Sequence, residues 1–423
     1  EVIQHCVRSA NKKLQSGWQM TTNEIALSYP ATYTSAQRQR LIELAEKASL
    51  ADGTQVHVSG TIAEPAAAGL DYLSRFDSDK ETTVLVYDLG GGTFDLALVA
   101  LYPKGRTNGD GDYYYDILAV DGLEDVGGGE FDEIMYQLIE QKLQVPLNPS
   151  HKAALRAEAE KIKKDLTFDA YADAEVLYNN EYLTVRVTRE EFETASRELL
   201  MRTIEATKKM FERHSNQKPE TIILTGGASQ MPMVKRALEE AFPEYKGDEM
   251  KHKEDKIQIS NPSRAIADGA ARYGTAEAMN DIAEKAEAVS VVQTRVGYDL
   301  GIRFYHSVDD ESGYISTYIP AGTPIPYQAA YQNSTTLHED QRYSGFTVYE
   351  ANKAHPDSEQ VAEDYTEIMK VSLDHGREVP KGTRNESRLC IDKLGVLTIE
   401  AREADHPEKP IKSTVELKNL SKS

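Results

Sequence analysis

The sequence contains very little cysteine. Only Cys6 and Cys390 occur among 423 residues, far apart in the chain and outside any metal-ligand spacing. A disulfide framework needs several cysteines at regular intervals, and a structural zinc site needs them clustered. The sequence therefore argues against both and favours a reducing, cytoplasmic location.

Long apolar runs are also missing. No run reaches the roughly 20 residues that a membrane-spanning helix needs. The opening segment EVIQHCVRSANKKLQ lacks the apolar stretch of a signal peptide. We therefore expect no membrane partner. Because the chain starts with Glu1 rather than methionine, a leader that had been removed would leave no trace.

Positive charge is in short supply. The 48 Lys and Arg residues against 69 Asp and Glu give a formal net charge of −21. An acidic surface repels nucleic-acid phosphates, so we expect no nucleic-acid partner. With 40% apolar and 28% charged residues the composition is that of a soluble globular protein. A chain of 423 residues is too long for one compact core, so two or more domains are expected.

Strand and helix patterns alternate until about residue 280 and then give way to strands and turns. We interpret residues 1–280 as an α/β domain, 281–293 as a linker and 294–423 as a β-domain. Helices are expected after Ser35 as N-cap and from Glu64, and a hairpin around Asn179 and Asn180. Further helices are expected near 130–143, 153–166, 189–214, after Pro232 and after Asn261-Pro262.

The segment VLVYDLGGGTFDLALVAL holds the most specific chemical signal. Gly90, Gly91 and Gly92 permit positive φ and let backbone N–H groups converge on an anion. Thr93 adds a hydroxyl, and Asp88 and Asp95 could hold a hydrated Mg²⁺ ion. The residues after the glycines predict a strand, which excludes a Walker loop or a Rossmann turn. The alternative is a plain glycine hairpin with solvated aspartates.

Three other segments could complete a phosphate site. Gly226 and Gly227 lie between a predicted strand and a helix, and Gly127–Gly129 directly precede another helix. Helix N-termini of this kind bind anions, although both segments are equally typical of ordinary turns. A polar stripe follows helical spacing and, taken alone, indicates a solvated face; its members are Glu160, Lys163, Lys164 and Thr167.

Together these segments resemble the heat-shock protein seventy family, the DnaK-type chaperones. The similar stretches occur in the family's order: YPATYTSAQRQRLIELAEKASL, EPAAAGLDYL, YDLGGGTFD, VGGGEFDE, LTGGASQMPMV and NPSRAIADGAA. In the β-domain, LGIRF, IPAGTPIP and FTVYEA are also similar. The resemblance implies an actin-like ATPase fold, with residues 121–204 as an inserted subdomain, followed by a β-sandwich peptide-binding domain.

The resemblance also implies roles for individual residues around ATP or ADP. Asp88 and Asp95 would lie near Mg²⁺ through water, Thr93 near the γ-phosphate, and Glu64 would orient the metal or the attacking water. The residues implied to line phosphate and nucleoside are Gly90, Gly91, Gly92, Gly127, Gly128, Glu160, Lys163, Lys164, Thr167, Gly226, Gly227, Ala228 and Gln230.

A peptide groove and several partners follow from the same resemblance. Ile302, Phe346 and Val348 match positions that line a groove for extended apolar peptides, although from sequence alone ordinary core positions are favoured. The expected partners are unfolded polypeptides, a J-domain co-chaperone and a nucleotide-exchange factor. The expected function is ATP-dependent binding and release of unfolded segments.

The sequence departs from the family pattern at several positions. Gln230 replaces an arginine that stacks on adenine, Ala228 a serine, Ala66 a threonine and Ser263 an aspartate. Asn333 stands where the groove usually has an aromatic residue. The segment VSVVQTR is less apolar than the family's linker, which puts interdomain signalling in doubt.

The family's first phosphate loop, its catalytic lysine and its helical lid do not occur in the sequence, so we expect a fragment of a longer protein that by itself hydrolyses little ATP. The alternative is a non-enzymatic relative that acts as a nucleotide-exchange or holding chaperone. A sugar kinase of the same superfamily is disfavoured by the β-domain.

Overall fold

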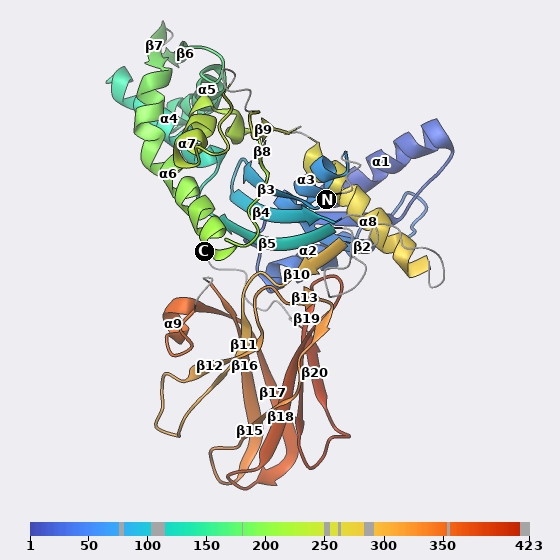
Figure 1. Ribbon diagram of the computed structural model, residues 1–423. Helices are drawn as coiled ribbons and strands as arrows, with labels where there is room; N and C mark the ends of the chain where they lie inside the picture. Colours follow the sequence, from blue (N-terminus) through green and yellow to red (C-terminus); the bar gives the residue numbers. More distant parts are fainter. Residues whose placement is uncertain are drawn as a thin grey trace.

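A computed structural model of the chain describes residues 1–75, 80–102, 115–179, 181–248, 254–260, 264–282, 292–352 and 356–414. Figure 1 shows a mixed α/β unit above and a unit of long strands below, with the chain passing from one to the other near β10. Helices and strands alternate through the first part of the chain, and strands predominate after β10.

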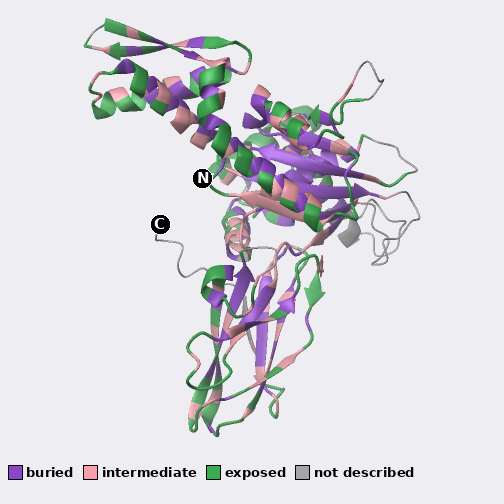
Figure 2. Cartoon of the chain, turned by 60° about the vertical axis from the view of Figure 1, so that its left-hand side comes forward, coloured by how far each residue is buried: buried purple, intermediate pink, exposed green. Residues whose placement is uncertain are grey.

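A seven-stranded sheet forms the centre of the α/β unit, in the order β13-β10-β5-β4-β3-β8-β9. The central strands are buried on both faces, which explains their unbroken apolar runs (Figure 2). The pairs β3–β4 and β4–β5 are antiparallel, whereas β3–β8 and β8–β9 are parallel. The strands are β3 (Thr82–Leu89), β4 (Phe94–Leu101), β5 (Tyr115–Leu123), β8 (Thr221–Thr225) and β9 (Ile257–Ile259).

Helices α3 (Glu64–Leu73) and α8 (Ala265–Ile282) cover one face of this sheet. Their contact is close because small residues meet: a Cβ atom on Gly269 of α8 would lie 1.8 Å from the carbonyl oxygen of Ala67 in α3. The helix predicted from Glu64 is confirmed, with a proline in its first turn. The opening of α8 by Asn261-Pro262 lies outside the described residues.

The other face of the sheet packs on a helical region that shares one continuous core with it. Phe131, Met135 and Ile139 are buried there, as their spacing predicts, and Leu155, Ala159 and Ile162 face them from the next helix. The elements are α4 (Gly128–Leu143), α5 (Pro149–Asp165), β6 (Tyr171–Tyr178), β7 (Glu181–Thr188), α6 (Arg189–Arg213), η1 (Ala228–Gln230) and α7 (Pro232–Ala241). The predicted hairpin is present between β6 and β7, although Asn180 is not among the described residues.

The N-terminal region adds α1 (Val2–Trp18), β1 (Glu24–Tyr29), α2 (Ser35–Glu46) and β2 (His57–Ala63), with β1 and β2 parallel. Helix α1 was not predicted, although Ile3, Val7, Ala10 and Leu14 follow helical spacing and Val7 is buried. The cap predicted at Ser35 is wrong by one residue. Thr34 caps α2 instead, since its hydroxyl accepts the N–H of Gln37, whose side chain bonds back to the N–H of Thr34.

The lower unit consists of two antiparallel sheets, β12-β11-β16-β17 and β14-β18-β19-β20, with β15 beside β18. One apolar cluster takes side chains from both sheets, including Val348 of β16 and Ile399 of β19. The strands are β11 (Leu300–Phe304), β12 (Tyr314–Ile319), β14 (Tyr327–Gln328), β15 (Gln332–Thr335), β16 (Gln341–Ala351), β17 (Tyr365–Val379), β18 (Arg384–Ile391), β19 (Leu397–Glu403) and β20 (Ile411–Thr414). A short helix, α9 (Val361–Asp364), precedes β17.

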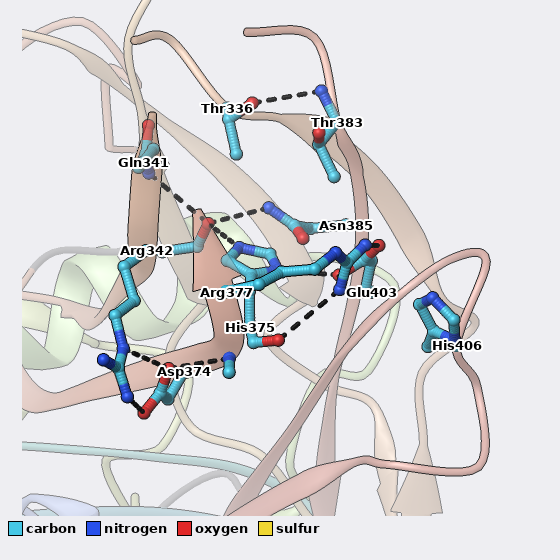
Figure 3. Close-up of polar contacts among 12 residues, drawn as sticks. Thr336, Gln341, Arg342, Asp374, His375, Arg377, Thr383, Asn385, Glu403 and His406 are labelled. Carbon is cyan, nitrogen blue, oxygen red and sulfur yellow. Dashed lines mark hydrogen bonds and ion pairs between the residues drawn. The ribbon is translucent and has the colours of Figure 1, made fainter. Parts of the chain in front are cut away.

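A polar network replaces the apolar core at the far end of this unit (Figure 3). His375 of β17 lies between Ser344 of β16 (3.0 Å from Nε2 to Oγ) and Glu403 of β19 (2.9 Å from Nδ1 to Oε2). Arg377 donates to Glu403, and Asn385 of β18 donates to Ser344 at 2.9 Å. Hydrogen bonds therefore join the two sheets where apolar contacts end.

The two units are connected through a shared strand. Strand β10 (Val292–Arg295) pairs in parallel with β5 and antiparallel with β13 (Pro324–Ile325). The domain boundary predicted at residue 294 falls inside β10. Residues 283–291 of the predicted linker lie outside the described residues. No helix in the described part of the chain has the length and hydropathy needed to cross a lipid bilayer.

Candidate functional site

The glycine hairpin places two carboxylates side by side. Asp88, the penultimate residue of β3, is the direct partner of Asp95 in β4. The turn between them is closed by a hydrogen bond from the N–H of Gly90 to the carbonyl of Thr93 (3.0 Å). Both aspartates are buried, with only 3% and 1% of their surfaces exposed, so the alternative of solvated aspartates is wrong.

Two glycine segments meet at this turn, and the close approach between them requires glycine at Gly127. Contrary to the expectation of positive φ, none of Gly90–Gly92 has it. Instead, the second glycine segment packs on the first: the N–H groups of Gly128 and Gly129 donate to the carbonyls of Gly90 and Gly91 (2.9 and 2.8 Å). A Cβ atom on Gly127 would lie 2.5 Å from the carbonyl carbon of Gly92. The two segments, predicted separately, thus form one double loop.

Two hydrogen bonds hold Asp95 in place. Its Oδ1 accepts the N–H of Ala31 (2.7 Å), and its Oδ2 accepts the hydroxyl of Thr93 (2.6 Å). Gly122 lies opposite it in β5, where a Cβ atom would come within 3.0 Å of Oδ1. Burial raises the pKa of Asp95, although the bonds from Thr93 and Ala31 oppose that shift.

Asp88 has a more exceptional environment. Its Oδ1 is buried and has no hydrogen-bond partner among the described residues. Burial, together with the nearby charges of Asp95 and Glu64, raises the pKa of Asp88 to about 7. Gly226 lies directly against it, since a Cβ atom there would be 2.4 Å from Oδ1. A carboxyl group so placed can hold either a proton or a cation at neutral pH.

Glu64 supplies the third carboxylate. It is the first residue of α3, and its pKa is raised by burial and by the charge of Asp95. The structure therefore brings Glu64, Asp88, Asp95 and Thr93 together as predicted. The like charges of Asp88, Asp95 and Glu64 repel one another, and a cation that prefers oxygen donors would relieve that repulsion. In the described part of the chain, however, no three His, Cys, Asp or Glu side chains are close enough to hold a metal ion by themselves.

The side chain of Lys163 contacts the double loop and does not lie on the exposed polar stripe. Its Nζ is 2.8 Å from the carbonyl oxygen of Gly128 and 2.7 Å from Oδ1 of Asp132. It is buried, whereas Glu160 and Lys164 form an exposed pair 2.6 Å apart on the helix surface. The solvated-face interpretation is thus right for Glu160 and Lys164 but wrong for Lys163. Thr167 lies near Lys163 in the wall of a small cleft that reaches α7.

The turn after β8 was predicted to lead directly into a helix, but a short 3₁₀ turn comes first. Gly226 has φ +79°, a conformation that favours glycine, and Gly227 follows in helical conformation. The 3₁₀ turn η1 then separates the glycines from α7, whose first residue is Pro232 as predicted. Ala228 is buried, and Gln230 is exposed with its amide 3.5 Å from the carbonyl oxygen of Gly227.

The three predicted groove residues lie inside the core of the lower unit. Ile302, Phe346 and Val348 expose 0%, 3% and 0% of their surfaces. In this conformation they are core residues, which is the alternative that the sequence favoured. Asn333 lies on β15, paired with β18.

Sequence reasoning missed the backbone partners of the carboxylates. The bond from Ala31 comes from a loop 64 residues away, and Gly122 was seen only as part of a strand. The stretch YPAT, which resembles the family, could have drawn attention to Ala31. No local sequence pattern, however, indicates that the N–H of Ala31 donates to Asp95.

Comparisons with known proteins place the sequence in a family. A family model described as Hsp70 protein matches residues 1–422. A chaperone protein HscA homolog of Aromatoleum aromaticum is 26% identical over 386 residues, which covers 89% of this chain and 54% of that protein. Another of Shewanella denitrificans is 25% identical over 411 residues, with 95% and 58% covered. Heat shock 70 kDa protein BIP3 of Oryza sativa is 28% identical, with 89% and 52% covered.

The chain thus spans about half the length of the curated relatives that it matches. The match to the family model extends over the α/β unit and the two-sheet unit alike. On this ground, the chain belongs to the Hsp70 family.

Proposed function

We propose that this chain carries the nucleotide site and the client-binding unit of an ATP-dependent chaperone of the Hsp70 type. The single observation that carries the proposal is the buried pair Asp88 and Asp95, held beside Thr93 in a glycine double loop. Membership of the Hsp70 family supports a chaperone function, nucleotide binding and an actin-like ATPase fold for the α/β unit. ATP hydrolysis and its coupling to peptide binding are the proposed steps.

The proposed catalysis depends on charged and polar groups that are already in position around the phosphates before the reaction starts. The backbone of Gly90–Gly92 and Gly127–Gly128 would face phosphate oxygens, with Lys163 behind them. On the nucleoside side the proposal places Gly226, Gly227 and, further out, Gln230. Phosphoryl transfer to water needs mostly positioning and neutralisation of charge, which such a preorganised site supplies.

The carboxylates would position the cation and the water. Asp88 and Asp95 present hard oxygen donors, and the unpartnered Oδ1 of Asp88 fits Mg²⁺ or a water molecule in its shell. When bound, Mg²⁺ would neutralise charge on the phosphates. Thr93, whose hydroxyl donates to Asp95 in this structure, would have to turn that hydroxyl toward the terminal phosphate, and Glu64 would orient water.

We further propose that the two-sheet unit is a β-sandwich that binds extended apolar peptide segments. Ile302, Phe346 and Val348 would contact a peptide only if the core that buries them opened at one edge. Backbone hydrogen bonds would then supply affinity and the apolar side chains selectivity. A J-domain co-chaperone and a nucleotide-exchange factor remain proposed partners of the whole protein.

Calorimetric titration with Mg·ATP and Mg·ADP tests the nucleotide site, on this chain and on the complete gene product. We expect binding that Asp88→Asn or Asp95→Asn weakens at least about tenfold. The exposed Asp173→Asn in β6 is the matched control. Absence of nucleotide binding in both proteins would overturn the proposal. Binding without turnover by the complete gene product would favour a non-enzymatic holding or exchange chaperone.

A further inference from the structure

The carboxylate pair is part of a longer row that crosses four strands and continues to the residue after a fifth. Asp88 of β3 pairs with Asp95 of β4 on one side and with Thr225 of β8 on the other. Gly122 of β5 is the partner of Asp95. Ser260, directly after β9, continues the row because its N–H donates to the β8 backbone (2.9 Å). Side chains in register point to the same face of a sheet, so these groups share one face and one edge.

This row points toward α3 and α8. Side chains alternate along a strand, and the apolar neighbours two positions from the row all belong to the core beneath these helices; they are Val86, Ala97 and Ile223. Gln258, two residues before Ser260, also faces this side, because it accepts a hydrogen bond from Tyr72 of α3 (3.0 Å). The row therefore lies where the apolar core ends, on the side on which α3 begins with Glu64.

Three oxygens in consecutive positions of this row are buried without a hydrogen-bond partner in the described part of the chain. They are Oδ1 of Asp88, Oγ1 of Thr225 and Oγ of Ser260, in residues that expose 3%, 0% and 6% of their surfaces. Buried polar groups are nearly always bonded, because an unmet one destabilises the fold. Three such atoms in adjacent register positions form a row of oxygen donors that no described residue satisfies.

The geometry also shows which way the oxygen of Asp88 is turned. The unpartnered oxygen of Asp88 is the one next to Gly226, which follows Thr225 at the end of β8. The oxygen is thus turned toward Thr225 rather than toward Asp95. The Gly226 backbone packs directly against this oxygen, since a Cβ atom there would be only 2.4 Å from it.

The donor set decides the chemistry. One carboxylate and two hydroxyls offer only oxygen, which magnesium prefers, and the neighbouring Asp95 makes the site unfavourable for an anion. We propose that Thr225 and Ser260 are further ligands, directly or through ordered water, of a divalent cation at Asp88. This inference rests on the proposed nucleotide site and extends it from β3 and β4 to β8 and the end of β9.

Electron paramagnetic resonance can measure how tightly this chain binds Mn²⁺ in the absence of nucleotide. The measurement tests whether the row of oxygens holds a divalent cation. We expect Thr225→Val to weaken Mn²⁺ binding roughly 3- to 10-fold and the double variant with Ser260→Ala at least about 10-fold. Thr225→Ser keeps the hydroxyl and should keep wild-type affinity. Thr207→Val is the control, since Thr207 is equally buried (0% exposed) but its hydroxyl already donates to Thr203.

Each other outcome has a distinct meaning. Suppose that Thr225→Val and the double variant with Ser260→Ala bind Mn²⁺ as the wild type does, while Asp88→Asn does not bind it. The role of Thr225 and Ser260 is then refuted and the proposed nucleotide site stands. If Thr207→Val weakens binding equally, the effect is one of stability and the inference fails. If the wild-type chain binds no Mn²⁺, the row is not a cation site, and Mg·ATP titration judges the nucleotide function separately.

Discussion

Arg295 and Asp116 are joined by two parallel hydrogen bonds, from Nε to Oδ1 (2.9 Å) and from Nη2 to Oδ2 (2.7 Å). The pair connects β10 to β5, and Asp116 exposes only 2% of its side chain. Two parallel hydrogen bonds to a buried carboxylate fix both the position and the orientation of the arginine side chain. The strand through which the chain leaves the α/β unit is therefore held by charge as well as by backbone pairing.

Replacing Arg295 with alanine should destabilise the α/β unit markedly, because Asp116 would remain buried without its charged partner. We expect a loss of about 2–4 kcal/mol in the free energy of unfolding. Denaturant titration followed by circular dichroism measures it. Arg186→Ala is the control, since Arg186 makes the same fork with Asp173 on an exposed surface and should cost less than about 1 kcal/mol. Equal losses would show that burial does not matter here.

Asp88→Asn should stabilise the metal-free protein at neutral and higher pH. The folded-state pKa of Asp88 is raised to about 7, so the folded chain keeps a proton that the unfolded chain has lost. Stability of the wild type therefore falls as pH rises from about 4 to about 7, whereas asparagine does not titrate. We expect a gain of roughly 1–3 kcal/mol above pH 7 that vanishes near pH 4.

Thermal melts across this pH range test the effect. Added Mg²⁺ should stabilise the wild type more than the variant. A variant less stable than wild type at pH 8 would contradict the assigned burial of the charge.

Gly127→Ala should disrupt the double loop. The new methyl group would lie 2.5 Å from the backbone of Gly92, and moving the two segments apart would break the hydrogen bonds that Gly128 and Gly129 donate to Gly90 and Gly91. We expect a loss of about 1–3 kcal/mol in stability. Gly91→Ala is the matched control, since nothing in the described structure lies within 4 Å of its added Cβ atom. Hydrogen exchange at Gly128 and Gly129 should accelerate only in the first variant.

Glu403→Gln should weaken the lower unit in a pH-dependent way. Burial opposes ionisation of Glu403, but hydrogen bonds from Arg377 and His375 outweigh it and lower its pKa. A lowered carboxyl pKa gives stability that is present above the ordinary value and lost as pH falls. We expect a loss of about 1–3 kcal/mol at pH 7 that shrinks toward pH 4. Glu386→Gln, in a more exposed pair with Arg402, should change stability by less than about 1 kcal/mol.

The sequence was sufficient for several of the elements. Unbroken apolar runs indicated β3 and β4, and helical spacing predicted α3 and α6, because these apolar patterns are long and regular. It misplaced the cap of α2 by one residue, and it left α1 unpredicted. Neighbouring hydroxyl side chains, here those of Thr34 and Ser35, compete to cap a helix. The apolar pattern of the sequence does not indicate which of them does so.

Other relationships appeared only in three dimensions. Lys163 belonged to a surface stripe by its spacing, yet α5 places its ammonium against the carbonyl of Gly128. Thr225 and Ser260 are ordinary strand-end residues in the sequence, and only the parallel pairing of β3, β8 and β9 aligns them with Asp88.

The sequence by itself determined the glycine hairpin, its flanking aspartates and the division into α/β and β regions, because these follow from local conformational preference and hydrophobic period. The tertiary structure alone decided which carboxylate oxygen is left without a partner. It also decided that Gly127 must lack a side chain and that β10 joins the sheet of the α/β unit. Those facts depend on contacts between segments distant in the chain, and burial changes the energy of a charge only after such contacts form.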